Sequence, residues 1–351
     1  MNISSKGEFD GHLTLVTGGA GFIGVNAAAA FLDRGNEVVV FDNVSRRGAN
    51  QNLCWLRDRG RFEFVPGDIR REDDVGALFA CHPDATLVLH LAAQVAVTTS
   101  VANPRDDFLT NALGTLNVLE AVREWAPEAT LLYSSTNKVY GGMEDVAVEE
   151  RDGRHQYADL PCGVSEDRPL DFHSPYGCSK GAADQYVRDY ARIYGMKTVS
   201  LRQSCIYGPR QFGVEDQGWV AWFAIAGVTG QPITLYGDGK QVRDVLYIDD
   251  LVRAFELAAK HIDVTAGQVY NIGGGPSNVL SLLELIVHLE ALLGRKLPRS
   301  FEGWRPGDQK VYVSNIEKAR RDFGWSPTVP YREGVERLVS WVRENRVLFA
   351  E

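Results

Sequence analysis

Cysteine and long apolar runs are both scarce in this chain of 351 residues. The five cysteines form no Cys-x-x-Cys pair and no Cys/His ligand spacing, so we expect no disulfide and no metal site, and we expect the thiols to be buried apolar groups. Charged residues interrupt every apolar segment that could span a bilayer, and residues 1–11 are polar, without the apolar region of a signal sequence. These absences predict a cytoplasmic protein with no membrane contact.

Basic residues are also in short supply. The chain has 37 lysines and arginines against 46 aspartates and glutamates, which gives a formal net charge of −9. Binding to nucleic acid or to an acidic membrane needs a basic face, so we expect neither partner. An anionic substrate would need a local cluster of arginines. The hydrophobic residues make up 44% of the chain, which at this length is enough for a large core in two lobes or one large domain.

Strand-like and amphipathic helical segments alternate through the first half of the chain. Such alternation predicts an α/β fold, a doubly wound parallel sheet with helices on both faces. In the second half, 249–260 and 268–272 have the pattern of a helix and a strand that return to this sheet. The expected strands are 12–17, 37–42, 61–65, 86–91, 129–134 and 197–202, and the expected helices between them are 22–34, 71–80, 106–124 and 176–194.

A glycine motif, with Gly18, Gly21 and Gly24, follows the first expected strand and opens the first expected helix. This is the context of a dinucleotide-binding turn, in which glycines let the backbone approach a pyrophosphate at the positive end of a helix. The motif therefore predicts a Rossmann-type sheet. We expect the NAD-binding domain to comprise 10–204 plus about 245–275, interleaved with a smaller substrate lobe of about 205–244 plus 276–348.

Asp42 ends the second expected strand, where an acidic side chain meets the hydroxyls of the adenosine ribose. A carboxylate at this position repels a 2′-phosphate, so NAD is favoured over NADP, although Arg46 and Arg47 lie nearby. Asp68 and Ile69, after the third strand, are placed to contact adenine. A helix-capping role for Asp68 is an equally good interpretation.

Tyr176 and Lys180 are spaced one helical turn apart in a stretch of good helix formers. A phenol is a poor base at neutral pH, and we expect the Lys180 ammonium to lower the pKa of Tyr176. Tyr176 would then exchange a proton with a sugar hydroxyl, while the hydroxyl of Thr136 holds the same oxygen. Together with the glycine motif, these residues predict nicotinamide redox chemistry on an alcohol.

Two further segments bear on this site. Tyr236 and Lys240 repeat the Tyr-x-x-x-Lys spacing, but Gly237 and Gly239 lie between them, so we interpret the pair as part of a turn. The stretch 141–173 is predicted to be a long irregular loop beside the catalytic groups. It is interpreted as a substrate-side flap, with a solvated insertion as the alternative.

Several motifs together resemble the extended short-chain dehydrogenase/reductase family that acts on nucleotide sugars. The resemblance covers nearly the whole chain and implies a set of NAD-binding positions beyond the glycines and Asp42. Within the family, the chain is most similar to C2 epimerases of the CDP-paratose/CDP-tyvelose type. The motifs are Thr17-Gly-Gly-Ala-Gly-Phe-Ile-Gly24, Phe41-Asp-Asn-Val-Ser-Arg46, His90-Leu-Ala-Ala93, Asn111-x-x-Gly-Thr-x-Asn117, Ser134-Ser-Thr-Asn-Lys-Val-Tyr-Gly141, Tyr176-x-x-x-Lys180, Gln241-Val-Arg-Asp244 and Gly324-Trp-Ser-Pro327, and the implied positions are Phe22, Ile23, Asn43, Ser45, Arg46, Leu91, Ala92, Ala93, Gln94, Asn111, Tyr176 and Lys180.

Two positions next to Thr136 separate branches of this family. Related 4,6-dehydratases have Asp and Glu there, the acid and base that eliminate water, whereas this chain has Asn137 and Lys138. An amide and an ammonium cannot perform that paired carboxylate chemistry, so dehydration is disfavoured. The chain also departs from its relatives at Cys205, where many of them place an Asn on the sugar diphosphate.

The resemblance also implies which residues bind the nucleotide sugar. Arg243 would hold the diphosphate, and Arg305 with Asp308 would hold the phosphate and the nucleotide ribose, because the planar guanidinium binds phosphate oxygens in pairs. The alternative for each single arginine is a surface salt bridge. The remaining expected substrate contacts are Thr136, Asn137, Lys138, Gln203, Arg210 and Gln211.

These observations lead to the expectation of an NAD-dependent nucleotide-sugar 2-epimerase that binds a nucleotide-diphosphate sugar. Three alternatives stay open: a 4-epimerase of a UDP-hexose or UDP-uronic acid, a C2 epimerase of a non-deoxy CDP- or GDP-hexose, and a catalytically silent NAD-sensing protein of the same fold. We also expect a homodimer or higher homo-oligomer formed through the helix of Tyr176, because apolar and aromatic residues follow it from Ala182 to Tyr194.

Overall fold

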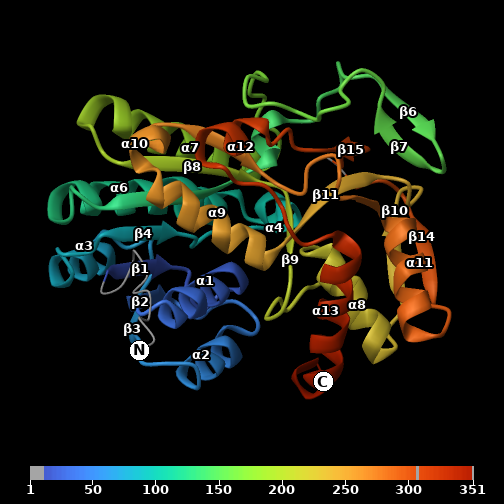
Figure 1. Cartoon of the computed structure of the whole chain (residues 1–351), viewed down its shortest axis with the longest axis horizontal. Coiled ribbons are helices and arrows are strands. Elements are labelled where there is room, and N and C mark those ends of the chain that lie inside the picture. Colours follow the sequence, from blue (N-terminus) through green and yellow to red (C-terminus); the bar gives the residue numbers. More distant parts are fainter. Residues whose placement is uncertain (1–11, 306–307, 350–351) are drawn as a thin grey trace, which may run out of the picture.

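The computed structural model describes residues 12–305 and 308–349 (Figure 1). The polar segment 1–11, which includes the start of the expected first domain at residue 10, lies outside the described residues. Positions 306–307, between the expected substrate residues Arg305 and Asp308, also lie outside the described residues. In the described part of the chain, no helix has both the length and the apolar content needed to cross a bilayer.

A seven-stranded, wholly parallel sheet forms the centre of the larger lobe, in the order β12-β8-β5-β4-β1-β2-β3. This confirms the expected α/β fold and all of the strands expected in the first half. The order reverses between β1 and β4, and ligands of such sheets bind at the carboxyl ends of the strands near that reversal. The strands are β1 (Leu13–Thr17), β2 (Glu37–Asp42), β3 (Glu63–Pro66), β4 (Leu87–His90), β5 (Thr130–Thr136), β8 (Thr198–Gln203) and β12 (Val269–Ile272).

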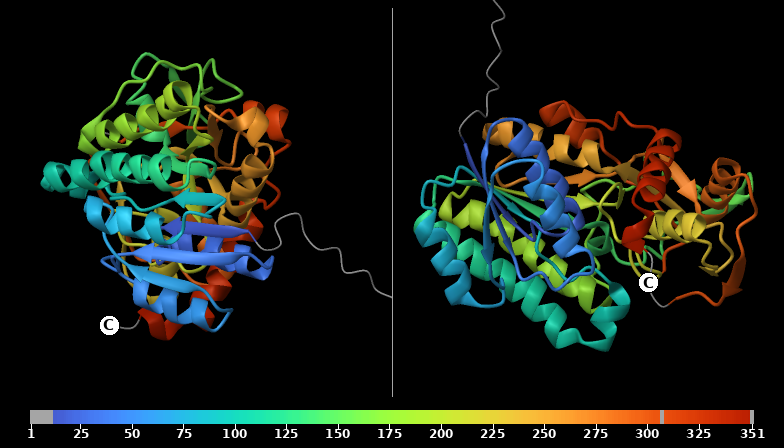
Figure 2. Two further views of the ribbon diagram at one scale, coloured as in Figure 1. Left: turned by 90° about the vertical axis from the view of Figure 1, so that its left-hand side faces the viewer. Right: turned by 90° about the horizontal axis from the view of Figure 1, so that it is seen from below.

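Helices cover both faces of this sheet, and each face has its own apolar core (Figure 2). Side chains alternate along a strand, so Val38 and Val40 of β2 pack with one set of helices while Val39 and Phe41 pack with the other. Each such fully buried side chain contributes about 1.5–3 kcal/mol. One face carries α1 (Phe22–Asp33), α2 (Ala49–Arg57) and α9 (Ile248–Lys260), and the other carries α3 (Glu72–Cys81), α6 (Gly114–Trp125) and α7 (Ser174–Tyr194).

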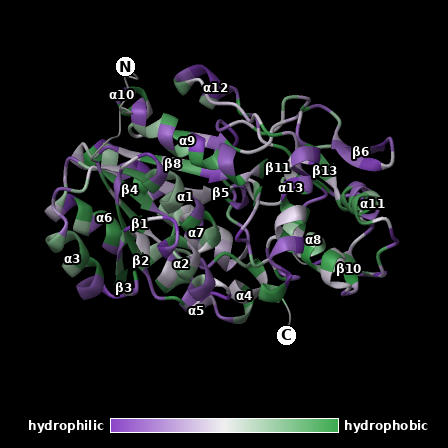
Figure 3. Ribbon diagram, turned by 60° about the horizontal axis from the view of Figure 1, so that its bottom comes forward, coloured by the Kyte–Doolittle hydropathy of each residue, from purple (hydrophilic) through white to green (hydrophobic). Residues whose placement is uncertain are grey.

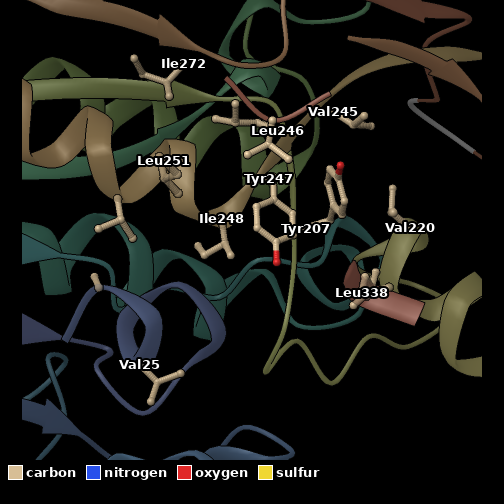
Figure 4. Close-up of a cluster of buried hydrophobic side chains, with 14 of the residues drawn as sticks. Val25, Tyr207, Val220, Val245, Leu246, Tyr247, Ile248, Leu251, Ile272 and Leu338 are labelled. Carbon is tan, nitrogen blue, oxygen red and sulfur yellow. The ribbon is translucent and has the colours of Figure 1, made fainter. Parts of the chain in front are cut away.

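A smaller lobe is built on β11 (Val242–Tyr247), whose final residues lead directly into α9 of the main lobe. The core is continuous between the lobes: Val25 and Leu251 belong to the same cluster as Tyr207, Val220 and Leu338 (Figure 4). The other elements of this lobe are β9 (Cys205–Tyr207), β13 (Val279–Ser281) and β15 (Val311–Tyr312), which share the sheet of β11, the pair β10 (Ile233–Tyr236) and β14 (Arg299–Glu302), and the helices α8 (Trp219–Thr229), α11 (Leu282–Leu293) and α13 (Tyr331–Glu344).

The structure differs from the sequence-based expectations in three places. The expected helix 106–124 is α5 (Pro104–Phe108), a π-helical turn η1 (Leu109–Leu113) and then α6. The expected irregular loop 141–173 contains a hairpin, β6 (Val148–Arg151) and β7 (Arg154–Tyr157). The expectation of buried cysteines is wrong for four of the five, since Cys54, Cys81, Cys162 and Cys178 are exposed free thiols and Cys205 is half-buried.

Short elements complete the described chain. They are the helices α4 (Val97–Ala102), α10 (Ile262–Thr265) and α12 (Glu317–Phe323), and the single turns η2 (Asn137–Tyr140) and η3 (Arg346–Phe349). Hydropathy follows this architecture: the strands of the main sheet are largely hydrophobic, whereas α12 and β6 at the periphery are largely hydrophilic (Figure 3).

A buried carboxylate fastens α7 to the sheet. Asp184 is 0% exposed and accepts hydrogen bonds from Ser135 of β5 at 2.7 Å, and from Ser200 and Arg202 of β8 at 2.6 and 2.8 Å. Burial raises the pKa of Asp184, but the Arg202 guanidinium and the hydroxyl donors outweigh it and hold that pKa below its usual range. Arg202 also donates to the Tyr140 hydroxyl at 3.1 Å, so α7, β5, β8 and η2 meet at this pair.

We expect Asp184→Ala to lower the free energy of unfolding by about 3–5 kcal/mol, because it leaves the Arg202 guanidinium buried without its counter-charge. Urea denaturation followed by circular dichroism measures the change. Asp189→Ala is the matched control, since Asp189 is exposed on the same helix and its loss should cost no more than about 0.5 kcal/mol. Equal stabilities of the two variants would contradict the anchoring role of Asp184.

Candidate active site

A cavity of about 440 Å³ lies at the carboxyl ends of β1, β2 and β4, lined by the glycine motif. Gly18 has φ of +71°, and a Cβ on it would lie 2.6 Å from the backbone nitrogen of Ala92. A Cβ on Gly24 would lie 2.2 Å from the carbonyl oxygen of Gly18. Only glycine fits these positions, and the bare backbone at the start of α1 leaves the close approach that a dinucleotide pyrophosphate needs. The chain therefore fits the cofactor that its sequence predicts.

Asp42 is fixed at the edge of this cavity by two backbone donors. The Ala20 amide donates to its Oδ2 at 3.0 Å and the Val44 amide to its Oδ1 at 2.7 Å. Burial nevertheless raises the pKa of Asp42 above its ordinary value, because these hydrogen bonds only partly offset the loss of water around the carboxylate. The side chain is thus a rigid acceptor that faces the cavity.

Most of the expected cofactor residues line this cavity together. Asp68 does not cap α3; it accepts hydrogen bonds from Asn43 and Arg70, and these bonds, led by Arg70, lower the pKa of Asp68 to about 2. The expected residues found in the lining are Gly18, Gly21, Phe22, Ile23, Gly24, Asp42, Asn43, Ser45, Arg46, Asp68, Ile69, Leu91, Ala92, Ala93 and Gln94.

Asn111 is an exception, because it lies behind the cavity wall. Its side chain is buried in η1, where Oδ1 accepts from the Gln94 amide at 2.9 Å and Nδ2 donates to Ser179 of α7 at 3.2 Å. Asp107, also buried, accepts from the same Ser179 at 2.5 Å. Asn111 thus positions the loop after β4 rather than facing the cavity, and a π-helical turn at such a place is common beside functional sites.

Arg210 and Gln211, which were expected to contact the substrate, line the same cavity as the glycine motif. The Arg210 guanidinium lies 4.5 Å from the ring centre of Trp55 and 5.6 Å from that of Trp341, a stacking that orients a cation. Gln211 is buried, and its Oε1 has no hydrogen-bond partner. These residues belong to a segment, 209–217, that passes from the small lobe over the large one.

Segment 209–217 meets the loop after β2 closely. Phe212 lies so near Gly48 that a Cβ there would be 2.0 Å from its ring. Arg46 donates to Gln217 at 3.4 Å, and Asn52 donates to the carbonyl oxygen of Arg210 at 3.4 Å. Sequence reasoning missed this contact, since its partners are more than 150 residues apart.

The three expected catalytic residues converge where β5 ends and α7 begins. The Thr136 hydroxyl is near enough to Tyr176 to lower the pKa of its phenol, and Lys180 donates to the carbonyl oxygen of Ser134 at 2.5 Å. The Lys180 ammonium also lies 4.2 Å from the ring centre of Tyr133. The helix begins at Ser174, two residues before the expected start, with Pro175 in its first turn, and the side chains of Tyr176 and Lys180 are buried.

The acidities of this group differ from the expectation. Burial raises the pKa of Tyr176 to about 12, with the Thr136 hydrogen bond opposing that rise, and burial lowers the pKa of Lys180 to about 7. The expected lowering of the phenol pKa by Lys180 is therefore wrong for the protein alone. Desolvation dominates because both side chains leave water while the Lys180 ammonium is directed at a backbone carbonyl.

A second polar group contains residues from both lobes. Lys138 lies in η2, and the charges of Arg243 and Asp308 and the Cys205 thiol act on it. Burial, followed by the Arg243 charge, lowers the pKa of Lys138 to about 8. Lys138, Arg243 and Asp308, all expected at the substrate, thus lie within electrostatic range of one another.

The remaining expected substrate residues are more scattered. Asn137 and Gln203 are buried at the ends of β5 and β8, and Nε2 of Gln203 has no partner. Arg305 stacks 3.6 Å from the ring centre of Tyr236 and pairs with Asp216 at 3.1 Å.

Tyr236 ends β10 and is followed by two glycines with positive φ, Gly237 and Gly239. This confirms the interpretation of the second Tyr-x-x-x-Lys spacing as a turn.

Gln309 is a residue that sequence reasoning missed. It is buried, donates to the carbonyl oxygen of Gly141 at 2.5 Å, and accepts from Lys138 Nζ at 3.4 Å. The only signal for Gln309 in the sequence is that it directly follows Asp308.

Within the described residues, no group of three or more His, Cys, Asp or Glu side chains is arranged to hold a metal ion.

Known proteins match this arrangement over nearly the whole chain. The model of the NAD dependent epimerase/dehydratase family matches residues 14–273. The CDP-paratose 2-epimerase of Salmonella typhi is 47% identical over 333 residues, covering 93% of this chain and 98% of that enzyme. A putative UDP-glucose 4-epimerase of Methanocaldococcus jannaschii is 32% identical and covers 95% of this chain and 99% of its own.

Solved structures agree with the sequence matches. The UDP-glucose 4-epimerase of Thermotoga maritima, solved with UDP-glucose, has a TM-score of 0.80 at 31% identity and covers 95% of this chain and 99% of its own. The UDP-glucuronic acid 4-epimerase of Bacillus cereus, solved with UDP-glucuronic acid and NAD, has a TM-score of 0.80 at 30% identity with the same coverage. These matches confirm the expected family and the expected cofactor, NAD. The chain belongs to the NAD dependent epimerase/dehydratase family.

Proposed function

We propose that the protein is an isomerase that inverts C2 of a CDP-linked sugar of the paratose/tyvelose type. The observation that carries the proposal is the pair Asn137 and Lys138 beside Thr136, which supplies no carboxylate for elimination of water. The 47% identity to the Salmonella typhi CDP-paratose 2-epimerase supports the same reaction and sugar.

The catalytic roles follow from the convergence of Thr136, Tyr176 and Lys180. Bound NAD supplies a hydride acceptor and donor. Thr136 holds the oxygen of the sugar hydroxyl, and Tyr176 takes its proton and later returns it. Burial opposes ionisation of Tyr176 and protonation of Lys180 separately, whereas a phenolate and an ammonium one turn apart stabilise each other. We therefore assign Lys180 the role of counter-charge to the ionised Tyr176.

The position of inversion limits the mechanism. A ketone at C4 acidifies the protons at C3 and C5, so oxidation at C4 cannot invert C2 by a single enolisation. Direct oxidation of C2 gives a 2-keto sugar that accepts hydride on its other face. This route needs no carboxylate to abstract a carbon-bound proton, which agrees with Asn137 and Lys138. It requires the keto sugar to turn while the nucleotide stays anchored.

The two lobes divide these tasks. We propose that Asp42 accepts the hydroxyls of the adenosine ribose of NAD, and that its fixed carboxylate repels the 2′-phosphate of NADP. In the smaller lobe, Arg243, Arg305 and Asp308 hold the nucleotide diphosphate. The continuation of β11 into α9 supports a division into interleaved lobes with boundaries near 205, 245 and 276.

A 4-epimerase of a UDP-hexose or UDP-uronic acid is the second candidate. Thr136, Tyr176 and Lys180 can hold and deprotonate a hydroxyl at either carbon, with NAD as the hydride acceptor. The putative 4-epimerase of Methanocaldococcus jannaschii and the 4-epimerase of Thermotoga maritima also match nearly the whole chain. The two candidates predict different products from different nucleotide sugars, so product analysis separates them.

We also propose that the protein is a homodimer that pairs through α6 and α7. Tyr186, Ile193 and Tyr194 are exposed on α7, and Trp125 is exposed at the end of α6. Large apolar side chains gathered on neighbouring helices are typical of a protein–protein interface. Light scattering coupled to gel filtration should give twice the chain mass, and a Tyr186→Glu/Ile193→Glu variant should give the chain mass. A wild-type protein of monomer mass would contradict the proposal.

Tyr176→Phe should retain the fold and NAD binding but lower turnover by about 100-fold or more, the usual scale for losing general acid–base help. Turnover is measured with the nucleotide sugar, and folding by circular dichroism. Tyr186→Phe, which removes an exposed hydroxyl from the same helix, is the matched control and should leave turnover unchanged. Wild-type turnover in Tyr176→Phe would remove this residue from catalysis.

The direct-hydride mechanism at C2 is tested with deuterium. Incubation with CDP-paratose in D₂O should give a product without solvent deuterium at C2, and substrate labelled with deuterium at C2 should keep its label. Both outcomes are read by NMR of the recovered sugar. Solvent deuterium at C2 would favour enolisation and exclude the hydride route.

Conversion of UDP-glucose to UDP-galactose without turnover of CDP-paratose would favour the 4-epimerase.

A further inference from the structure

Lys138 and Arg243 are two cations that approach each other from different lobes. Lys138 follows β5 in η2, whereas Arg243 lies on β11. The two come to one region because Gln309, which contacts Lys138, leads into β15, and β15 pairs with β11 at Arg243; the Arg243 charge accordingly contributes to the lowered pKa of Lys138. Arg243 donates to the Val242 carbonyl oxygen at 2.8 Å, and Lys138 donates to Gln309 at 3.4 Å. Among residues 12–305 and 308–349, neither cation has a carboxylate within ion-pair distance.

Such a pair is unfavourable in the free protein. Two like charges repel, and removal from water costs each of them further free energy unless an opposite charge compensates. The carboxylate of Asp308 is exposed, and it offsets only part of the lowering of the Lys138 pKa. Both cations keep partial exposure, so a ligand can reach them. The missing partner is therefore an anion that arrives with the substrate.

We propose that Lys138 joins Arg243 in binding the diphosphate of the nucleotide sugar, and that Lys138 takes up a proton as the diphosphate binds. The inference rests on the proposed function, because it takes a nucleoside diphosphate as the ligand. It adds a specific role for Lys138, which links the lobe carrying Tyr176 to the lobe that anchors the nucleotide.

The direction of the proton movement follows from the charges that face Lys138. Burial and Arg243 hold the pKa of Lys138 at about 8, while Asp308 and the Cys205 thiol oppose that lowering. A dianionic diphosphate favours the ammonium form and raises the pKa. Above pH 8 the free protein therefore has mostly neutral Lys138 and the complex has the ammonium, so binding consumes a proton. Near pH 7 both states are protonated and little proton is consumed.

Calorimetric titration of the NAD-loaded protein with CDP measures this uptake. The heat is recorded at pH 7.0 and 8.5 in buffers with different ionisation enthalpies, and the difference between buffers gives the number of protons exchanged. The phosphate groups of CDP are fully ionised at pH 8.5, because their last pKa is near 6. We expect uptake of more than about half a proton at pH 8.5 for a pKa near 8, and affinity that falls as the pH rises above 8.

Two variants separate charge from packing. Lys138→Arg keeps a cation that does not titrate in this range, so it should bind CDP without proton uptake and without the loss of affinity above pH 8. Lys138→Met removes the charge and should weaken binding at pH 7.0 by about 10- to 100-fold, as for a lost charge-assisted hydrogen bond. Lys197→Met, at an exposed lysine that pairs with Glu128, is the control and should match the wild type in both readouts.

The outcomes distinguish this inference from the proposed function. Wild-type binding of CDP without proton uptake at pH 8.5 would overturn the role of Lys138 and leave the proposed function standing. Uptake that persists in Lys138→Arg would assign the proton to another group and would also overturn it. If CDP fails to bind while UDP or GDP binds, the proposed nucleotide is wrong, and the same titrations with the nucleotide that binds decide the role of Lys138. Absence of uptake in the wild type overturns the role of Lys138 even where a variant fails to fold.

Discussion

The buried ion pair of Asp184 and Arg202 is the interaction on which the catalytic geometry depends. Asp184 lies one helical turn after Lys180 and two after Tyr176, and its carboxylate holds α7 against β5 and β8 at once. A buried pair of this kind adds little net stability relative to an apolar core, because desolvation consumes most of the attraction. The ion pair instead fixes the orientation of α7. If α7 rotated or slid, the Asp184 and Arg202 charges would be buried without a partner, so Tyr176 is held in a single position over the end of β5.

Local sequence signals predicted the main sheet and the catalytic group well. Gly24 is required by contacts with Gly18 and Gly19, only a few residues away, and Thr136 lies at the end of a strand whose neighbours in the sheet are consecutive in the alternating pattern. The hairpin around Asp152 and Gly153 also had a local signal, since Asp-Gly between short strands favours a two-residue turn, but the acidic composition of the stretch obscured it.

Other features could not be predicted, because they depend on long-range contacts and burial. The residue type of Arg210 suits a sugar phosphate as well as a cofactor, and only the path of 209–217 across the large lobe places it between Trp55 and Trp341. The pKa of Tyr176 is likewise set by how much water the folded chain excludes, which spacing along a helix does not show. Gln309 meets Lys138 only because β15 returns beside β11.

The contact of Phe212 with Gly48 has a consequence for the life of the cofactor on the protein. Segments from both lobes line the cavity and touch each other there, through this contact and through Arg46 and Gln217. A dinucleotide held in the cavity lies beside the contacts that segment 209–217 makes with the loop after β2, so its release requires these contacts between the lobes to open. Its residence time should therefore exceed many turnovers. NAD then behaves as a built-in prosthetic group, and each epimerisation begins and ends with the same molecule in the oxidised state, independent of the NADH level around the protein.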